Sequence, residues 1–180
     1  MEWEFFFLNY IQTNLRNPFF DTVMPIISLL GKYGAAIIVI FIIALISKKH
    51  KRLSMKLLFS VVLTSISFLI LKSTINRMRP YVLDTTVQLI VKPEVTTSFP
   101  SGHTFFAFSS ATVCFMYNKK LGIAMYIYAI IMAFSRLYLY VHFPTDVLFG
   151  IIFGIITGII AYKLEDFVFT KKEKLHKKSY

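Results

Sequence analysis

Long apolar runs separated by short polar segments dominate this chain. From residue 33 onward, five runs are apolar enough to predict helices that cross a membrane. The runs cover residues 33–47, 53–71, 104–117, 121–134 and 147–162. Such helices suit a bilayer core about 30 Å thick, which requires roughly 20 apolar residues per crossing. The pattern predicts an all-α, integral-membrane helical bundle with five transmembrane helices, in a single domain over residues 1–180.

The first 33 residues do not show one clear crossing helix. An apolar stretch at residues 5–11 and another at 19–30 are separated by a polar interruption, and the second stretch contains Asp21 and Pro25. Neither stretch is long enough to cross a bilayer alone. We expect interfacial helices or a re-entrant pair here, and the alternative is a sixth, kinked span.

The positions of the basic residues predict the orientation in the membrane. Lysines and arginines gather at residues 48–56, 119–120 and 171–178, each group beside an apolar run. Cytoplasmic loops of membrane proteins carry such clusters. We therefore expect a multi-pass protein of the cell's inner membrane, with a cytoplasmic C-terminus. The polar segments 72–103 and 135–146 then lie together toward the outer, periplasmic face.

Composition agrees with a membrane protein and argues against a nucleic-acid partner. The chain is 56% hydrophobic and 17% aromatic, with a mean hydropathy of +0.64, which is far from an ordinary soluble domain. The formal net charge of +11 would suit nucleic acid, but the basic residues follow the apolar runs. The expected partner is the lipid bilayer.

A stripe of small residues marks the last apolar run. Gly150, Gly154 and Gly158 are spaced four apart and would lie on one face of a helix. Small residues let two helix backbones approach closely. The stripe predicts close packing inside the bundle, and the alternative is a homodimer through the same face.

The segment 135–146 carries an arginine, a histidine and an aspartate between two apolar runs. Pro144 suits the first turn of a helix, which places Asp146 close to His142. Asp146 can accept a hydrogen bond from one ring nitrogen of His142, leaving the other as a nucleophile or a base. Arg136 adds a planar cation suited to phosphate. The alternative is a polar loop in which His142 and Asp146 pair only with each other.

Two further segments carry polar groups toward the same face. Lys72 and Arg79 are seven residues apart, so on a continuous helix they would share one face and suit a dianion. Arg77 lies off that face, and we expect it to anchor the preceding helix at the membrane surface. In the second segment, Ser101 and Gly102 at a helix start can expose backbone N–H groups to an anion. His103 beside such an anion can act as an acid.

Read together, these segments spell K-x6-R-P, P-S-G-H and S-R-x5-H-x3-D. Over residues 72–146 the chain resembles the type 2 phosphatidic acid phosphatase superfamily. The resemblance implies lipid phosphate hydrolysis without a metal, through a phosphohistidine intermediate. It implies that His142 is the nucleophile, that Asp146 orients it and that His103 is the general acid. The residues implied to bind the phosphoryl oxygens are Lys72, Arg79, Ser101, Gly102 and Arg136.

We expect no cofactor and no metal, because His103 and His142 lack a third ligand and the nearby cations would repel a divalent ion. The resemblance offers three candidate substrates: undecaprenyl pyrophosphate, phosphatidylglycerol phosphate and lipid A 1-phosphate. The loop 81–99 holds few charges, so we expect limited headgroup selectivity. The rival interpretation is a non-catalytic lipid-binding scaffold or a transporter, which would not need both histidines together with Asp146.

Overall fold

The computed structural model describes residues 2–32, 35–47 and 49–178, and its described part is all-helical. Tyr33 and Lys48, which the sequence places in the first crossing helix and the first basic cluster, lie outside these residues, as do the side chains of the basic tail. The helices are α1 (Glu2–Asn14), α2 (Pro18–Lys32), α3 (Ala35–Ile46), α4 (Lys51–Thr74), α5 (Pro80–Leu83), α6 (Gly102–Tyr117), α7 (Lys119–Tyr138) and α8 (Pro144–Lys178).

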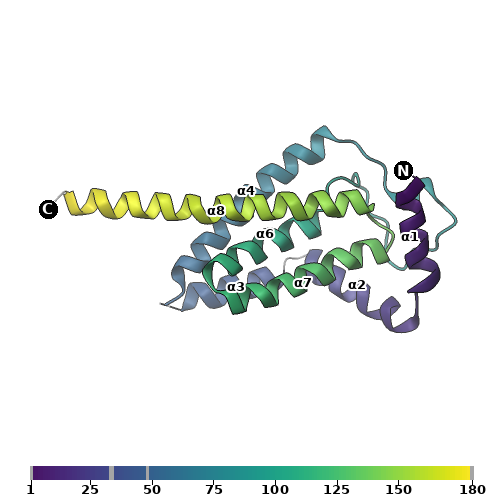
Figure 1. The fold of residues 1–180 in the computed structure, drawn as a ribbon, viewed down its shortest axis with the longest axis horizontal. Helices are drawn as coiled ribbons and strands as arrows, with labels where there is room; N and C mark the ends of the chain where they lie inside the picture. The colour runs from purple at the N-terminus through teal and green to yellow at the C-terminus, as the bar shows by residue number, and fades with distance from the viewer. Residues whose placement is uncertain (1, 33–34, 48, 179–180) are drawn as a thin grey trace.

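Helix α6 forms the centre of the bundle. It packs along α7 and α8 and also contacts α4, while α3 lies on α4 and α2 lies on α7. Figure 1 shows α6, α7 and α8 running along the long axis, with α8 extending beyond the other helices at its C-terminal end. The turn from α7 to α8 and the loop before α6 meet at the opposite end, beside α1. The polar segments therefore converge at one end of the bundle.

The outer surface of the long helices is apolar. Large hydrophobic side chains such as Ile66 on α4, Ile127 on α7 and Ile152 on α8 are exposed, as is typical of a lipid-facing surface. By length and composition α4, α7 and residues 144–169 of α8 are candidates for crossing a membrane. Helix α3 has 12 residues and α6 has 16, both short of the roughly 20 that a crossing requires. The all-helical bundle agrees with the sequence prediction. Within the described residues, helix length supports three of the five predicted crossings.

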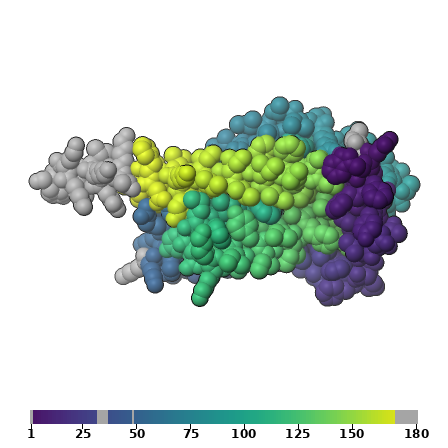
Figure 2. All heavy atoms as spheres, viewed as in Figure 1, coloured from purple at the N-terminus to yellow at the C-terminus, as the bar shows by residue number. Residues whose placement is uncertain are grey.

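Helix α1 lies across the end of the bundle, at a steep angle to α8 (Figures 1 and 2). Its buried side chains are Glu4, Leu8 and Ile11, at the spacing of one helix face. Trp3 and Phe6 on the other side are 58% and 76% exposed. An aromatic outer face suits the interface between lipid and water. This arrangement fits the interfacial alternative for the N-terminal segment.

The glycine stripe of α8 packs against α6 of the same chain. A Cβ atom at Gly154 or Gly158 would lie 2.8 or 2.6 Å from a backbone oxygen of α6, and one at Gly150 would lie 3.0 Å from the oxygen of Ser101, just before α6. The distances at Gly154 and Gly158 are shorter than real Cβ contacts, and the distance at Gly150 is tighter than most of them, so larger residues would push the two helices apart. The structure therefore shows the predicted close packing of the glycine stripe inside the bundle. A homodimer through this face would have to separate α8 from α6.

Lys56, the last lysine of the basic cluster at residues 48–56, is buried between two helices. Its side chain is 3% exposed, and its ammonium lies 2.6 Å from both Glu165 and Asp166. Helix α8 continues beyond residue 162, where the predicted apolar run ends, and brings these two carboxylates onto α4. A buried charge needs such partners. Lys56 therefore holds α4 to α8 instead of facing water.

Candidate active site

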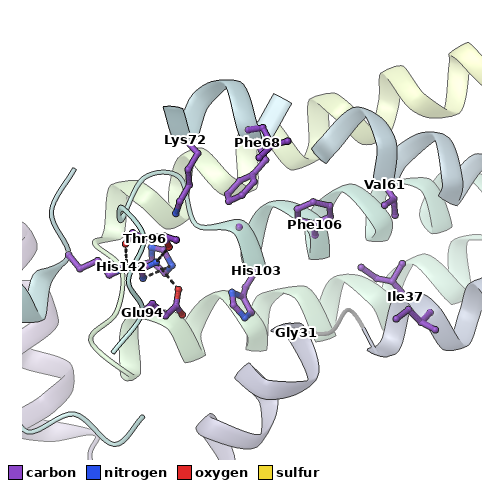
Figure 3. A pocket seen from close by; sticks show the side chains of 14 residues that line it. Gly31, Ile37, Val61, Phe68, Lys72, Glu94, Thr96, His103, Phe106 and His142 are labelled. Atoms are coloured by element: carbon purple, nitrogen blue, oxygen red, sulfur yellow. Dashed lines mark hydrogen bonds and ion pairs between the residues drawn. The ribbon is translucent and has the colours of Figure 1, made fainter. Parts of the chain in front are cut away.

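The three polar segments that the sequence predicts to meet line one cavity of about 600 Å³. Lys72 comes from the end of α4, Arg79 from the segment before α5, Gly102 and His103 from the start of α6, and His142 from the turn between α7 and α8. Figure 3 shows His103 and His142 with Glu94 close by. These groups are separated by up to 70 positions in the sequence, so the tertiary fold assembles the cavity.

His142 is buried, with 1% of its surface exposed. Its Nε2 atom lies 3.4 Å from a guanidinium nitrogen of Arg79. Burial penalises the imidazolium and, despite the nearby carboxylate of Asp146, lowers the pKa of His142 to about 4. The ring is therefore neutral at physiological pH and has a lone pair available for attack.

Asp146 lies close to His142 but does not hydrogen-bond to it in this structure. The Nδ1 atom of His142 is 3.7 Å from Oδ2 of Asp146, which is longer than a hydrogen bond. That oxygen instead accepts hydrogen bonds from the Ser98 hydroxyl at 2.5 Å and the Phe143 N–H at 2.9 Å. The predicted proximity is present, and the carboxylate faces the neutral ring across this distance.

Arg77 is a site residue that sequence reasoning missed. The expectation that it anchors α4 at the membrane surface is wrong, because its guanidinium lies 2.6 Å from Asp146 and 2.6 Å from Glu4. It also donates to the Thr145 hydroxyl at 2.6 Å, and Glu4 accepts from that same hydroxyl. Arg77 thus fixes the far side of the Asp146 carboxylate and links it to α1. Glu4 is 73 positions away in sequence, so no local pattern could reveal the pair.

The expected helical route from Lys72 to Arg79 is also wrong, although both residues reach the cavity. Helix α4 ends at Thr74, and Arg79 has extended backbone angles, φ −80° and ψ 153°. Pro80 disfavours helical geometry at the residue before it. An extended segment therefore carries Arg79 into the site. Lys72 donates to the Thr97 carbonyl at 2.5 Å from the other side.

The cations of the site already hold a carboxylate. One oxygen of Glu94 accepts from Arg79 at 2.7 Å, and the other accepts from Arg136. Burial alone would raise the pKa of Glu94, but the two guanidinium groups outweigh it and lower the pKa to about 2. Arg136 does not line the cavity directly and reaches it through Glu94. The sequence offered Glu94 only as one of three charges in a loop.

The N-terminus of α6 contributes the His103 side chain and backbone N–H groups to the cavity, but not the Ser101 hydroxyl. Ser101 is buried and its hydroxyl pairs with Thr104 at 2.9 Å, outside the residues that line the cavity. Gly102 does line the cavity, so the first N–H groups of α6 lie beside it. The Nε2 atom of His103 is buried without a hydrogen-bond partner in the part of the chain that the structure describes. It is thus available to hydrogen-bond to a ligand.

Gly31, near the end of α2, leaves space for the His103 ring because it has no side chain. A Cβ atom at this position would lie 2.9 Å from the His103 ring and 2.4 Å from the end of the Met132 side chain. Any larger residue would push on the histidine, so the close approach requires glycine.

The cavity has a polar end and an apolar end. In Figure 3, Lys72, Glu94, Thr96 and His142 cluster on one side, and the apolar side chains extend away from them past His103. The apolar lining consists of Ile37, Ile38, Val61, Phe68, Leu69 and Phe106. A cavity with this polarity suits an anionic headgroup attached to a hydrocarbon chain.

Comparison with known proteins matches this arrangement to one family. The family model of the PAP2 superfamily matches residues 53–169. An undecaprenyl-diphosphatase from Sulfolobus acidocaldarius is 26% identical over 147 residues, which cover 80% of this chain and 71% of that protein. Shorter matches to two Bacillus proteins span 40% and 45% of those proteins' lengths.

Two solved structures share the fold. LpxE from Aquifex aeolicus superposes with a TM-score of 0.78 and 32% identity, covering 87% of this chain and 93% of that one. A transmembrane PAP2-type phosphatidylglycerolphosphate phosphatase from Bacillus subtilis superposes with a TM-score of 0.69 and 26% identity, covering 84% of this chain and 79% of that one.

Proposed function

The chain belongs to the PAP2 superfamily, and from this premise we propose that it is a metal-independent membrane lipid phosphatase. Its reaction is hydrolysis of a phosphomonoester or pyrophosphate headgroup. The observation that carries the proposal is the position of His142: a buried, neutral imidazole lies 3.4 Å from Arg79, in a cavity that is cationic at one end and apolar at the other.

We infer the following roles for the side chains. Nε2 of His142 attacks phosphorus, while Nδ1–H faces Asp146. The carboxylate charge of Asp146 stabilises the positive charge that the ring acquires in the phosphohistidine intermediate. His103 gives a proton to the departing oxygen and then takes one from the water that hydrolyses the phosphohistidine. Lys72, Arg79 and Arg136, with the N–H groups at Gly102, neutralise the phosphoryl oxygens. Such charge neutralisation and positioning are the main demands of phosphoryl transfer.

The substrate is a lipid whose chain lies along the apolar end of the cavity. Undecaprenyl pyrophosphate, phosphatidylglycerol phosphate and lipid A 1-phosphate are the candidates. The names of the relatives from Sulfolobus and Bacillus favour the first two. The apolar side chains at that end of the cavity offer no polar group that would select one hydrocarbon chain, so the phosphate group and not the chain decides recognition.

Release of phosphate from these three lipids tests the proposal. Purified protein in excess chelator is expected to hydrolyse at least one of them, because the residues around His142 supply the positive charge directly. Inorganic phosphate is measured as the product. A lipid-binding scaffold or a transporter would bind lipid without releasing phosphate, and activity that requires an added divalent ion would contradict the metal-independent mechanism.

We propose that the protein lies in the inner membrane with five crossings, formed by α3, α4, α6, α7 and α8. The site then faces the outer, periplasmic side and the C-terminus is cytoplasmic. The positions of the basic clusters support this orientation. The exposed aromatic side chains of α1, which covers the site end, support an interface at that level.

Cysteine labelling tests the orientation. Val95, in the loop near the site, is fully exposed, and the natural Cys114 is buried. A Val95→Cys variant is expected to react with a membrane-impermeant thiol reagent added to intact cells, once any outer membrane has been permeabilised. A Lys120→Cys control at the other end of the bundle is expected to react only after lysis. The reverse pattern would place the site on the cytoplasmic side.

A further inference from the structure

Glu94 occupies the place where the proposed function requires a phosphate. Its two carboxylate oxygens accept hydrogen bonds from Arg79 and Arg136, two of the cations assigned to the phosphoryl group. The residue lines the same cavity as His103 and His142, and Figure 3 shows its carboxylate at the polar end between them. A carboxylate held by two guanidinium groups accepts the hydrogen bonds that a bound phosphate would accept, with one negative charge in place of two or more.

We propose that Glu94 is a specificity-determining residue that occupies the phosphate-binding arginines in the free protein and must be displaced by the substrate. The proposal rests on the proposed function. As a consequence, the site selects lipid headgroups by their charge. Headgroups that carry two or more negative charges displace the carboxylate, and phosphodiester headgroups with one negative charge do not.

The surroundings of Glu94 allow its side chain to move while its backbone stays in place. The Glu94 N–H donates to the Tyr81 hydroxyl at 3.0 Å, and that hydroxyl donates to the Glu94 carbonyl at 2.7 Å. These two bonds fix the chain at this point of the loop. The side chain itself is 35% exposed, so a rotation about its own bonds can carry the carboxylate out of the cavity.

Only another anion can release this carboxylate under ordinary conditions. The pKa of Glu94 is lowered to about 2, chiefly because the Arg136 and Arg79 guanidinium groups outweigh the cost of burial. The carboxylate is therefore charged at neutral pH. Protonation does not release it at that pH, and the two buried arginines would keep only neutral hydrogen-bond partners if it departed without a replacement.

The charge of a ligand then decides whether it displaces the Glu94 carboxylate from the arginines. A bilayer presents phosphodiester lipids in large excess over any phosphomonoester or pyrophosphate lipid. A diester phosphate carries a single charge, as the carboxylate does, so it gains no Coulomb advantage from the exchange. A doubly charged phosphate gains more from the same cations. The few charges in this loop predict limited headgroup selectivity, and we infer that Glu94 discriminates by phosphate charge and not by the rest of the headgroup.

The Glu94→Gln variant tests the inference, because glutamine keeps the size and one acceptor oxygen but loses the charge. A ligand's apparent affinity is reduced by the fraction of time for which its site is available. If the arginines are available for roughly 1–10% of the time, the dissociation constant of inorganic phosphate is expected to fall about 10- to 100-fold in the variant. Titration calorimetry on purified protein in a non-ionic detergent measures it.

A second measurement tests the selection against diesters. Phosphatidylglycerol added to mixed micelles at constant surface dilution is expected to inhibit turnover by the Glu94→Gln variant strongly and turnover by the natural protein weakly. The Asp84→Asn control removes one charge from the start of the same loop, where the carboxylate contacts Thr86 and Tyr140 instead of the arginines. Its phosphate affinity and its response to phosphatidylglycerol are expected to match the natural protein.

The outcomes separate this inference from the proposed function. A natural protein that neither binds phosphate nor releases it from any lipid would overturn both. A natural protein that does both, with a Glu94→Gln variant that binds phosphate no more tightly, would overturn the role of Glu94 alone. Should the Gln variant fail to fold, Glu94→Asp decides the question, because its shorter side chain holds the arginines less well. Tighter phosphate binding by that variant supports the inference, and equal or weaker binding refutes it.

Discussion

Replacing His142 with alanine is expected to abolish hydrolysis of every lipid phosphate, because no phosphohistidine can form without the imidazole. The expected loss is at least about four orders of magnitude, the scale found when a sole catalytic nucleophile is removed. Initial rates at saturating substrate measure it. Steady turnover by His142→Ala that approaches the natural rate would refute the assignment of the nucleophile and with it the mechanism.

Two controls make this result specific. His50→Ala removes a histidine at the other end of the bundle, where it hydrogen-bonds to the Tyr117 hydroxyl at 2.8 Å, and is expected to leave the rate unchanged. The His142→Ala protein itself is expected to bind inorganic phosphate, because Lys72, Arg79 and Arg136 remain in place. Retained binding would show that the site is folded and that only the attack on phosphorus is lost.

Replacing His103 with alanine is expected to cost more on one class of substrate than on the other. A phosphomonoester lipid must release an alkoxide, which leaves poorly without a proton. A pyrophosphate lipid releases a lipid phosphate, which leaves readily as an anion. Since general-acid help contributes roughly 10²–10⁴-fold where it is needed, the monoester rate is expected to fall by about that factor and the pyrophosphate rate by much less.

The ratio of variant to natural rates on the two substrates, measured at one pH, checks this role. Loss of a hydrogen-bond donor from the cavity weakens binding of both substrates alike, so it does not change the comparison. Gly31→Ala is a useful companion variant, because its Cβ would press on the His103 ring without removing it. It is likewise expected to lower the rate on the phosphomonoester lipid more than the rate on the pyrophosphate lipid. Equal losses on both substrates, with chemistry rate-limiting, would mean that His103 only binds.

The sequence alone was sufficient to predict the helical class, the main helices and part of the cavity lining, namely Lys72, Arg79, Gly102, His103 and His142. These predictions depend on properties that act locally. An apolar run forms a helix because the bilayer or the bundle interior requires its backbone to bond within itself. Pro144 begins α8 and Gly102 begins α6, each for reasons that lie in a few neighbouring residues. The spacing from His142 to Asp146 is likewise short enough to be read directly.

Pairings between distant residues were decided only by the tertiary structure. Arg77 was expected to face the membrane surface and instead bridges Asp146 to Glu4, and Glu94 was one charge in a loop and instead lies on Arg79 and Arg136. Lys56 likewise finds its carboxylates on α8. A buried charge takes the partner that folding brings within about 3 Å, and sequence separation carries no information about that distance. The hydrophobic pattern determined which segments are buried, and the packing of helices on helices determined which charges meet there.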